Sequence, residues 1–300
     1  MHKKILWYNI DINSHLPPRI KLKVIEDWLE YEKKEDTGYI FRLIHIMENQ
    51  SPPDDNLIKY LQEKILLSYR TLDFYKFHLG ETVTEDEIRS YLKEQVIPKN
   101  ENQFDRNVRQ GDWGEVLAAL IVSKFHDLEV PINKLQWKFN KDKAVFGTDL
   151  LAFNKGDKIE DIYYYEIKTR LNPNNKETKN GESHYIAVWA YRSLEKDEQS
   201  PTESIADFLE RLYFEKEEYD TASKFKDIVK NPQNYNRKFE LFLIIEKSKF
   251  IDEILQELND LPPKLNPLNV TIVFIDNLRD FVKKTWQDIE NVLIEKLKNE

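Results

Sequence analysis

One short segment carries acidic and basic side chains at a spacing that can do metal or acid–base chemistry. Residues 161–170 read Asp-Ile-Tyr-Tyr-Tyr-Glu-Ile-Lys-Thr-Arg, a composition typical of a β-strand. Alternate side chains of a strand share a face, so Glu166 and Lys168 point to the same side. The same spacing recurs at Glu32 and Lys34, and an exposed pair of this kind contributes only ~0–1 kcal/mol. The spacing alone therefore decides nothing, and its surroundings must be considered.

A second acidic residue lies one hairpin earlier in the chain. Asp149 follows Gly147 at the start of a strand predicted over residues 148–153, and a turn at Gly156 leads to the next strand. Two carboxylates on neighbouring strands can share a hard divalent cation, and Mg²⁺ typically takes one or two protein carboxylates together with waters and a substrate phosphate. Lys168, beside Glu166, can then orient an attacking water or offset charge in the transition state.

A third carboxylate comes from a helix predicted over residues 113–125. Glu115 follows Gly114 near the start of this helix and shares a stripe with Ala118, Ala119 and Val122. The small alanine side chains let the helix lie close to a sheet. We therefore expect Glu115 to reach the same site as the two strand carboxylates.

The elements that must position these residues alternate between helix and strand. Three consecutive strands flanked by helices predict an α/β domain with a mixed sheet. The predicted order is helix 113–125, strands 135–139, 148–153 and 162–167, helix 200–218, strand 239–245, helix 250–258, strand 270–275, and helix 278–296 capped by Asp276.

The first hundred residues have a different pattern, which predicts a mainly helical region. Apolar residues recur at three- and four-residue spacing, and Thr84 with Glu87 forms a capping box. We therefore divide the chain into residues 1–100, a helical region suited to docking a partner, and residues 101–300, the domain that carries the chemistry. The predicted elements of the first region are helices 20–32, 39–47, 57–69 and 85–95 and a strand at 5–12.

Composition excludes several classes of protein. The 7 glycines cannot form a P-loop or a dinucleotide-binding motif, and four of them (Gly111, Gly114, Gly147 and Gly156) surround the predicted site. The 6 histidines show no zinc-hydrolase spacing, and no nucleophile-elbow motif is present. The absence of Cys fits a reducing cytoplasm, and no apolar run approaches the length of a membrane span or a signal peptide. A net charge of −9 is unusual for a protein that grips nucleic acid alone.

The order of the acidic motifs resembles that of the PD-(D/E)XK nuclease superfamily over about residues 105–250. The resemblance implies a restriction-endonuclease-like core (helix, three strands, helix, strand) and a Mg²⁺- or Mn²⁺-dependent deoxyribonuclease. It also implies that Asp149 and Glu166 are metal ligands, that Lys168 is the catalytic lysine, and that Glu115 is an auxiliary acidic residue. Thr148 replaces the proline of the superfamily motif.

A narrower resemblance is to the HamA family, the effectors of the bacterial Hachiman anti-phage system. It is carried by the segments RQGDWGEVLAALIV, FGTDLLAF, YYYEIKTR and ELFLIIEK, followed by VTIVFIDNLRDFV. The resemblance implies a cytoplasmic nuclease subunit that acts on DNA and is held inactive by a partner helicase, HamB. An acidic chain without a nucleotide-binding loop fits this arrangement, because the partner can supply both the motor and the grip on DNA.

Weaker expectations and two alternatives remain. Arg170 and Lys176 lie just past the strand that carries Glu166, where substrate phosphates would approach, and solvated loop charge explains them equally well. Tyr164 shares the face of Glu166 and can pack against a nucleotide, although strand tyrosines are usually packing residues. His184 lies just beyond and is more simply an ordinary residue. The alternatives are a self-contained restriction-type endonuclease and a non-catalytic interaction subunit with a nuclease-like fold.

Overall fold

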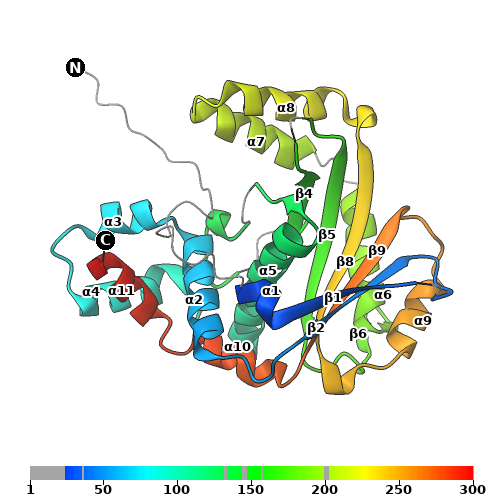
Figure 1. Cartoon of the computed structure of the whole chain (residues 1–300), viewed down its shortest axis with the longest axis horizontal. Helices are drawn as coiled ribbons and strands as arrows, with labels where there is room; N and C mark the ends of the chain where they lie inside the picture. Colours follow the sequence, from blue (N-terminus) through cyan, green and yellow to red (C-terminus); the bar gives the residue numbers. More distant parts are fainter. Residues whose placement is uncertain are drawn as a thin grey trace.

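A mixed sheet of seven strands forms the centre of the part of the chain that the structure describes (Figure 1). The structure is a computed structural model, and it describes residues 24–299 except 36, 132–133, 144–146, 157 and 199–202. The α/β class predicted from the sequence is confirmed. In spatial order the strands are β1 (Leu29–Lys34), β2 (Arg42–Glu48), β9 (Leu268–Ile275), β8 (Asn236–Glu246), β5 (Asp161–Arg170), β4 (Leu150–Asn154) and β3 (Leu128–Glu129).

Four neighbouring strands of this sheet, β2, β9, β8 and β5, run parallel, and β1, β4 and β3 pair antiparallel at the two edges. Parallel strands are covered on both faces and therefore consist of nearly continuous apolar runs. All side chains from Phe239 to Ile245 of β8 and nearly all of those of β9 are buried, which explains why the sequence identified these strands correctly.

One face of the sheet is covered by α5 (Gln103–Phe125), with α1 (Val24–Trp28), α2 (Asp55–Tyr69) and α10 (Leu278–Trp286) packed around it (Figure 1). The approach of α5 to β5 is very close at Gly114, where a Cβ atom would lie 1.9 Å from the hydroxyl oxygen of Thr169. Real Cβ contacts are never this short, so glycine at this position fixes how closely α5 can lie on the strand.

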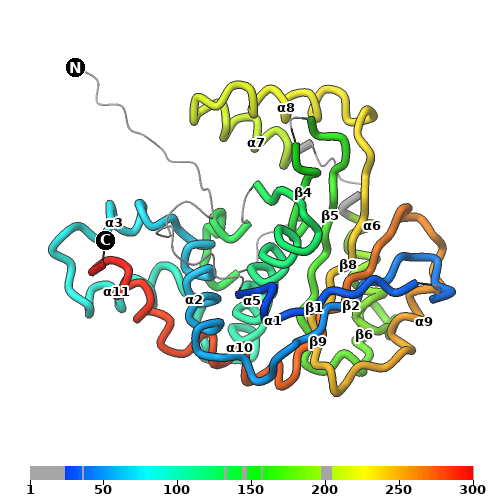
Figure 2. The backbone as a smooth tube through the Cα atoms, in the orientation of Figure 1, coloured from blue at the N-terminus to red at the C-terminus, as the bar shows by residue number. Residues whose placement is uncertain are grey.

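The opposite face is covered by α6 (Ile186–Glu198) and α9 (Glu253–Asn259), and by the hairpin of α7 (Glu203–Glu215) and α8 (Tyr219–Lys230). Apolar side chains of α6, α7, α8 and α9 share one core with the outward alternate residues of β4, β5, β8 and β9. Figure 2 shows α7 and α8 side by side at one end of β4 and β5, and α9 at the other end of the sheet.

The first hundred residues differ from the prediction in two places. The predicted helix 39–47 is mostly strand, since residues 42–48 form β2 and residues 39–41 are irregular, and the described part of the predicted helix 20–32 consists of α1 followed by β1. The pattern misled because both faces of β2 are buried: Leu43 packs on one face, and Ile44 and Ile46 pack on the other, which imitates helical spacing. The helices predicted at 57–69 and 85–95 are present as α2 and as α4 (Glu85–Tyr91) with a π-helical turn (Leu92–Val96), and the predicted capping box of α4 is formed.

Strands β1 and β2 belong to the seven-stranded sheet, so residues before 100 share a hydrophobic core with residues after 100. Strands from both sides of the predicted boundary near residue 100 therefore belong to one sheet. The region also contains α3 (Leu72–Leu79), and the strand predicted at 5–12 lies outside the described residues.

Three predictions in the second region are also wrong in detail. The predicted strand 135–139 is a short 3-10 helix, η2 (Lys134–Trp137). The single helix predicted at 278–296 is two helices, α10 and α11 (Glu290–Asn299), and Asn277 rather than Asp276 precedes the first one. The carboxylate of Glu246 accepts the amide hydrogens of residues 277 and 278, so the start of α10 is capped from a neighbouring strand.

Several elements were not predicted, and one predicted cap lies outside the described residues. The sequence did not identify α6, α8, β3, or the small hairpin of β6 (Glu177–Lys179) and β7 (Glu182–His184). The serine and proline expected to begin the helix at 200 are not described, although α7 itself is present. In the described ranges no helix has the length and apolar content that a membrane crossing requires.

Candidate active site

The register of β4 and β5 brings two carboxylates together at the start of β4. Leu150 is paired with Tyr165, so Asp149, one residue earlier, lies opposite Glu166. The backbone amide of Ile167 donates a hydrogen bond of 2.9 Å to Asp149 Oδ2, which fixes the orientation of this carboxylate. Both carboxylates are on the sheet face covered by α6, as strand alternation predicts.

Lys168 contacts both of these carboxylates. Its ammonium group donates a hydrogen bond to Glu166 Oε1 and lies 3.6 Å from Asp149 Oδ2. Burial alone would lower the pKa of Lys168, but the negative charges of Asp149 and Glu166 outweigh burial and raise it. Lys168 is therefore a fixed positive charge at neutral pH.

Glu166 is almost completely buried, with 3% of its surface exposed. Burial is the main cause that raises its pKa, and the nearby charge of Asp149 raises it further, while Lys168 and a hydrogen bond from Ser193 of α6 lower it. A second positive charge next to Glu166 would therefore stabilise its ionised form.

Glu115 belongs to α5, which covers the opposite face of the sheet, but its carboxyl lies within electrostatic range of Asp149. The side chain is partly buried, and its Oε2 atom is buried without any hydrogen-bond partner. Burial, followed by the negative charge of Asp149, raises the pKa of Glu115 to about 8. The structure thus brings Asp149, Glu166 and Lys168 into contact and places Glu115 within electrostatic range of Asp149.

A second lysine of this site was missed by the sequence reasoning. The ammonium group of Lys134 lies 3.1 Å from Asp149 Oδ1 and donates a hydrogen bond of 2.9 Å to the carbonyl of Gly147. Lys134 is the first residue of η2, which overlaps the strand that the apolar pattern predicts over residues 135–139. No motif marks this lysine, because its proximity to Asp149 depends on how the segment between β3 and β4 folds back.

A buried ion pair next to Glu115 was also missed. Lys138 Nζ lies 2.6 Å from Asp112 Oδ1, and the hydroxyl of Tyr69 donates a hydrogen bond to Asp112 Oδ2. Burial raises the pKa of Asp112 in spite of the lysine beside it. Asp112 precedes Glu115 by three positions on α5, so this pair fixes η2 to the helix close to the site. The only sequence signal was an acidic residue between Gly111 and Gly114.

The residues with weaker predictions are placed differently. Arg170, the last residue of β5, pairs with Glu177 at 2.8 Å, and Lys176, in the segment that follows, pairs with Glu257 at 3.0 Å. Tyr164 is buried and its ring stacks on that of Phe239, with 5.8 Å between the centroids. This tyrosine is a packing residue of the core. His184 Nδ1 lies 3.0 Å from the same Glu257 carboxylate and is not part of the carboxylate site.

The donor set fits a hard divalent cation. No group of three or more His, Cys, Asp or Glu side chains that could hold a metal occurs within the described ranges. Mg²⁺, however, commonly uses one or two carboxylates and completes its shell with water and substrate phosphate. Asp149 and Glu166 supply two carboxylates in one place, and Glu115, whose Oε2 has no partner, is close enough to Asp149 to feel its charge but does not complete a group of three acids among the described residues.

Comparison with known proteins identifies the family. None of the curated proteins compared with this chain matches it. A family model described as HamA matches residues 23–289, which is nearly the whole chain and includes the sheet, α5 and the carboxylate site. The chain therefore belongs to the HamA family and is a component of the Hachiman anti-phage defence system.

Proposed function

We propose that this protein is a metal-dependent nuclease that hydrolyses phosphodiester bonds in DNA and serves as the effector subunit of its defence complex. The observation that carries the proposal is the contact of Lys168 with both Asp149 and Glu166 at the junction of β4 and β5. The arrangement resembles the motif order of PD-(D/E)XK nucleases, in which an acidic residue on one strand precedes an E-x-K segment on the next. Membership of the HamA family supports a role in defence.

Asp149 and Glu166 would hold the Mg²⁺ or Mn²⁺ ion, with Glu115 as an additional acidic oxygen. When bound, the ion would polarise the phosphate and lower the pKa of a coordinated water. The protein supplies rigidity: the amide of Ile167 fixes Asp149, and the surrounding core fixes Glu166.

The role of Lys168 follows from its charge. Because its pKa is raised by two carboxylates, the side chain stays protonated at neutral pH and does not act as a base. A fixed ammonium next to the reacting phosphate offsets the negative charge that develops in the transition state, and it can hold the attacking water by a hydrogen bond.

Glu115 is suited to exchange a proton. Its pKa of about 8 lies close to physiological pH, and this is the range in which a general acid or base is most effective. Its unpartnered Oε2 atom is available to accept a hydrogen bond from a water in the site.

The acidic chain favours assistance from a partner. With a net charge of −9, the protein gains little general attraction to a polyanion, and this supports the proposal that a helicase partner delivers the DNA and controls access. Arg170 at the end of β5 and Lys176 after it would be the phosphate contacts, and both are paired with glutamates in this structure.

The test is cleavage of supercoiled plasmid with Mg²⁺ or Mn²⁺, by the protein alone and with its helicase partner. The variant Glu166→Gln/Lys168→Met keeps the side-chain sizes and should lower cleavage by at least about 100-fold. The matched control is Glu32→Gln/Lys34→Met, because this pair on β1 has the same spacing and a salt bridge of 2.6 Å but lies at the far edge of the sheet.

The outcomes separate the alternatives. Undiminished cleavage by the Glu166/Lys168 variant would contradict the assignment of the site. Discrete fragments from a random DNA pool would favour a self-contained restriction-type enzyme, whereas a smear fits an effector without sequence preference. No cleavage by the wild-type protein, with or without the helicase, would favour a non-catalytic interaction subunit.

A further inference from the structure

Lys134 covers the one oxygen of Asp149 that the sheet leaves open. Asp149 Oδ2 accepts the amide hydrogen of Ile167 and faces Lys168, whereas Oδ1 is 3.1 Å from Lys134 Nζ. The two side chains of the Lys134–Asp149 pair are only 11% and 15% exposed. The ammonium therefore lies in a largely desolvated position, where a ligand of Asp149 would have to enter.

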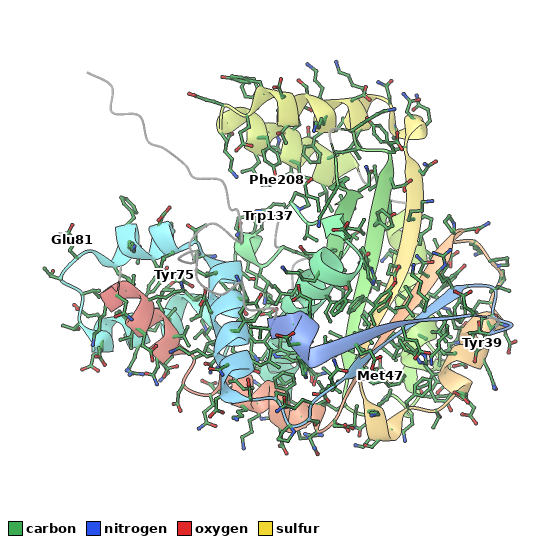
Figure 3. All side chains as sticks on the ribbon, viewed as in Figure 1. Tyr39, Met47, Tyr75, Glu81, Trp137 and Phe208 are labelled. Atoms are coloured by element: carbon green, nitrogen blue, oxygen red, sulfur yellow. The ribbon has the colours of Figure 1, made fainter. Side chains whose placement is uncertain are left out.

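The neighbours of Lys134 hold it there. Leu135 is 1% exposed in the core under α5, and Lys138 forms the buried ion pair with Asp112. The ring centroids of Trp137 and of Phe208 on α7 are 4.0 Å apart, and Figure 3 labels both residues. Since η2 is anchored on both sides of the sheet, the ammonium is positioned by the fold and is not a freely moving surface group.

The charges of the site are already balanced by lysines. Asp149 and Glu166 contribute two negative charges, and two positive charges offset them: Lys168 contacts both carboxylates, and Lys134 contacts Asp149. A divalent cation would enter this balanced group against the repulsion of both ammonium groups. Lys168 faces Asp149 Oδ2, which already accepts the backbone amide of Ile167. Lys134 is therefore the lysine that a cation would have to displace from Asp149.

We propose that Lys134 competes with the divalent cation for Asp149 Oδ1 and thereby sets the metal concentration at which the site is filled. The inference rests on the proposed nuclease function. Filling the site requires the ammonium of Lys134 to withdraw from Oδ1, and the carbonyl of Gly147 is a second acceptor already in contact with it.

The test is direct measurement of Mn²⁺ binding by electron paramagnetic resonance of the free ion, supported by calorimetric titration with Mg²⁺. Replacing Lys134 by Met removes the charge at similar side-chain length. Mn²⁺ binding should tighten by at least about tenfold, because the repulsion between the ammonium and the cation a few ångströms away is lost. Lys134→Arg, which keeps the charge, should bind Mn²⁺ about as weakly as the wild type. Lys134→Gln serves in place of Met if that variant does not fold, because its amide can still donate.

The matched control is Lys141→Met. Lys141 lies in the same segment and pairs with Asp142 at 3.1 Å, with 13% of its side chain exposed, so its burial and partner type are comparable. Its removal should leave Mn²⁺ affinity unchanged. Thermal unfolding in EDTA checks that every variant is folded before metal is added.

The failure of this inference can be told from failure of the proposed function. If the wild-type protein binds no Mn²⁺, or binds it as well after Glu166→Gln, the metal site itself is refuted. If the wild type binds Mn²⁺ through Glu166, and the neutral Lys134 variants bind it equally or more weakly, then Lys134 holds Asp149 in place and does not compete. That result would overturn the inference and leave the proposed function standing.

Discussion

Replacing Glu115 by Gln should remove a large part of the pH dependence of stability. The folded protein raises the pKa of this carboxyl from 4.5 to about 8, mainly through burial and then through the charge of Asp149. An acid with a raised pKa binds its proton more tightly in the folded state. The stability linked to Glu115 is therefore fully present below about pH 4.5 and is lost as the pH rises through about 8.

The size of the effect follows from the shift. Each unit of pKa difference corresponds to about 1.4 kcal/mol, so linkage predicts that Glu115 makes the wild-type protein lose at most about 4 kcal/mol between about pH 5 and about pH 9. The Gln variant has no proton to lose at this position and is nearly isosteric. It should therefore become more stable relative to the wild type as the pH rises.

The assay is urea unfolding at a series of pH values in EDTA, so that no divalent cation is bound. The quantity compared is the difference in free energy of unfolding between wild type and variant at each pH, since other buried carboxyls affect both proteins equally. A difference that changes by less than about 1 kcal/mol across the range would refute the inference that Glu115 is buried and uncharged at neutral pH. With Mg²⁺ present the difference should shrink, because a bound cation favours the ionised carboxylate.

Three further predictions concern the framework of the site and can be checked by urea unfolding. Gly114→Ala should destabilise the protein by about 1–3 kcal/mol because its Cβ would meet Thr169, and adding Thr169→Ala should recover part of the loss; an additive loss would contradict the clash. Asp112→Asn should cost about 3–5 kcal/mol because it leaves the Lys138 ammonium buried without a countercharge, and adding Lys138→Met should reduce that cost. Burial raises the pKa of Glu240 to about 7. Replacing Glu240 by Gln should therefore remove about 2–3 kcal/mol of the stability that the wild type loses between about pH 5 and about pH 9. An unchanged pH profile would count against the burial of Glu240 in its neutral form.

Part of the fold was predictable because its signals are local. The strands β8 and β9 are nearly continuous apolar runs, α2, α4 and α5 have helical spacing, and the predicted capping box of α4 is confirmed. The helix predicted at 113–125 begins ten residues earlier, because α5 starts at Gln103 behind an Asn102 cap that the apolar spacing did not mark. The adjacency of Asp149 and Glu166 was predictable for the same reason, since a single hairpin joins their strands and alternation decides the face. The roles assigned to them remain predictions.

Other elements were beyond local signals. A strand buried on both faces imitates a helix, which is why β2 was misread, and its place next to β9 depends on residues more than 200 positions away. The break between α10 and α11 was hidden because the apolar spacing continues across Asp288, whose φ of 51° interrupts the helix.

The sequence by itself determined the α/β class, the pair of carboxylates with its neighbouring lysine, and the exclusion of nucleotide-loop and thiol chemistry, because each depends on residue type and short spacing. Only the tertiary structure decided that η2 returns to the site, that Lys134 covers Asp149, and that Lys138 and Asp112 form a buried pair beside Glu115. The physical reason is that these contacts join segments with no shared periodicity. Their energies come from desolvation and through-space charge, which exist only when the chain has packed.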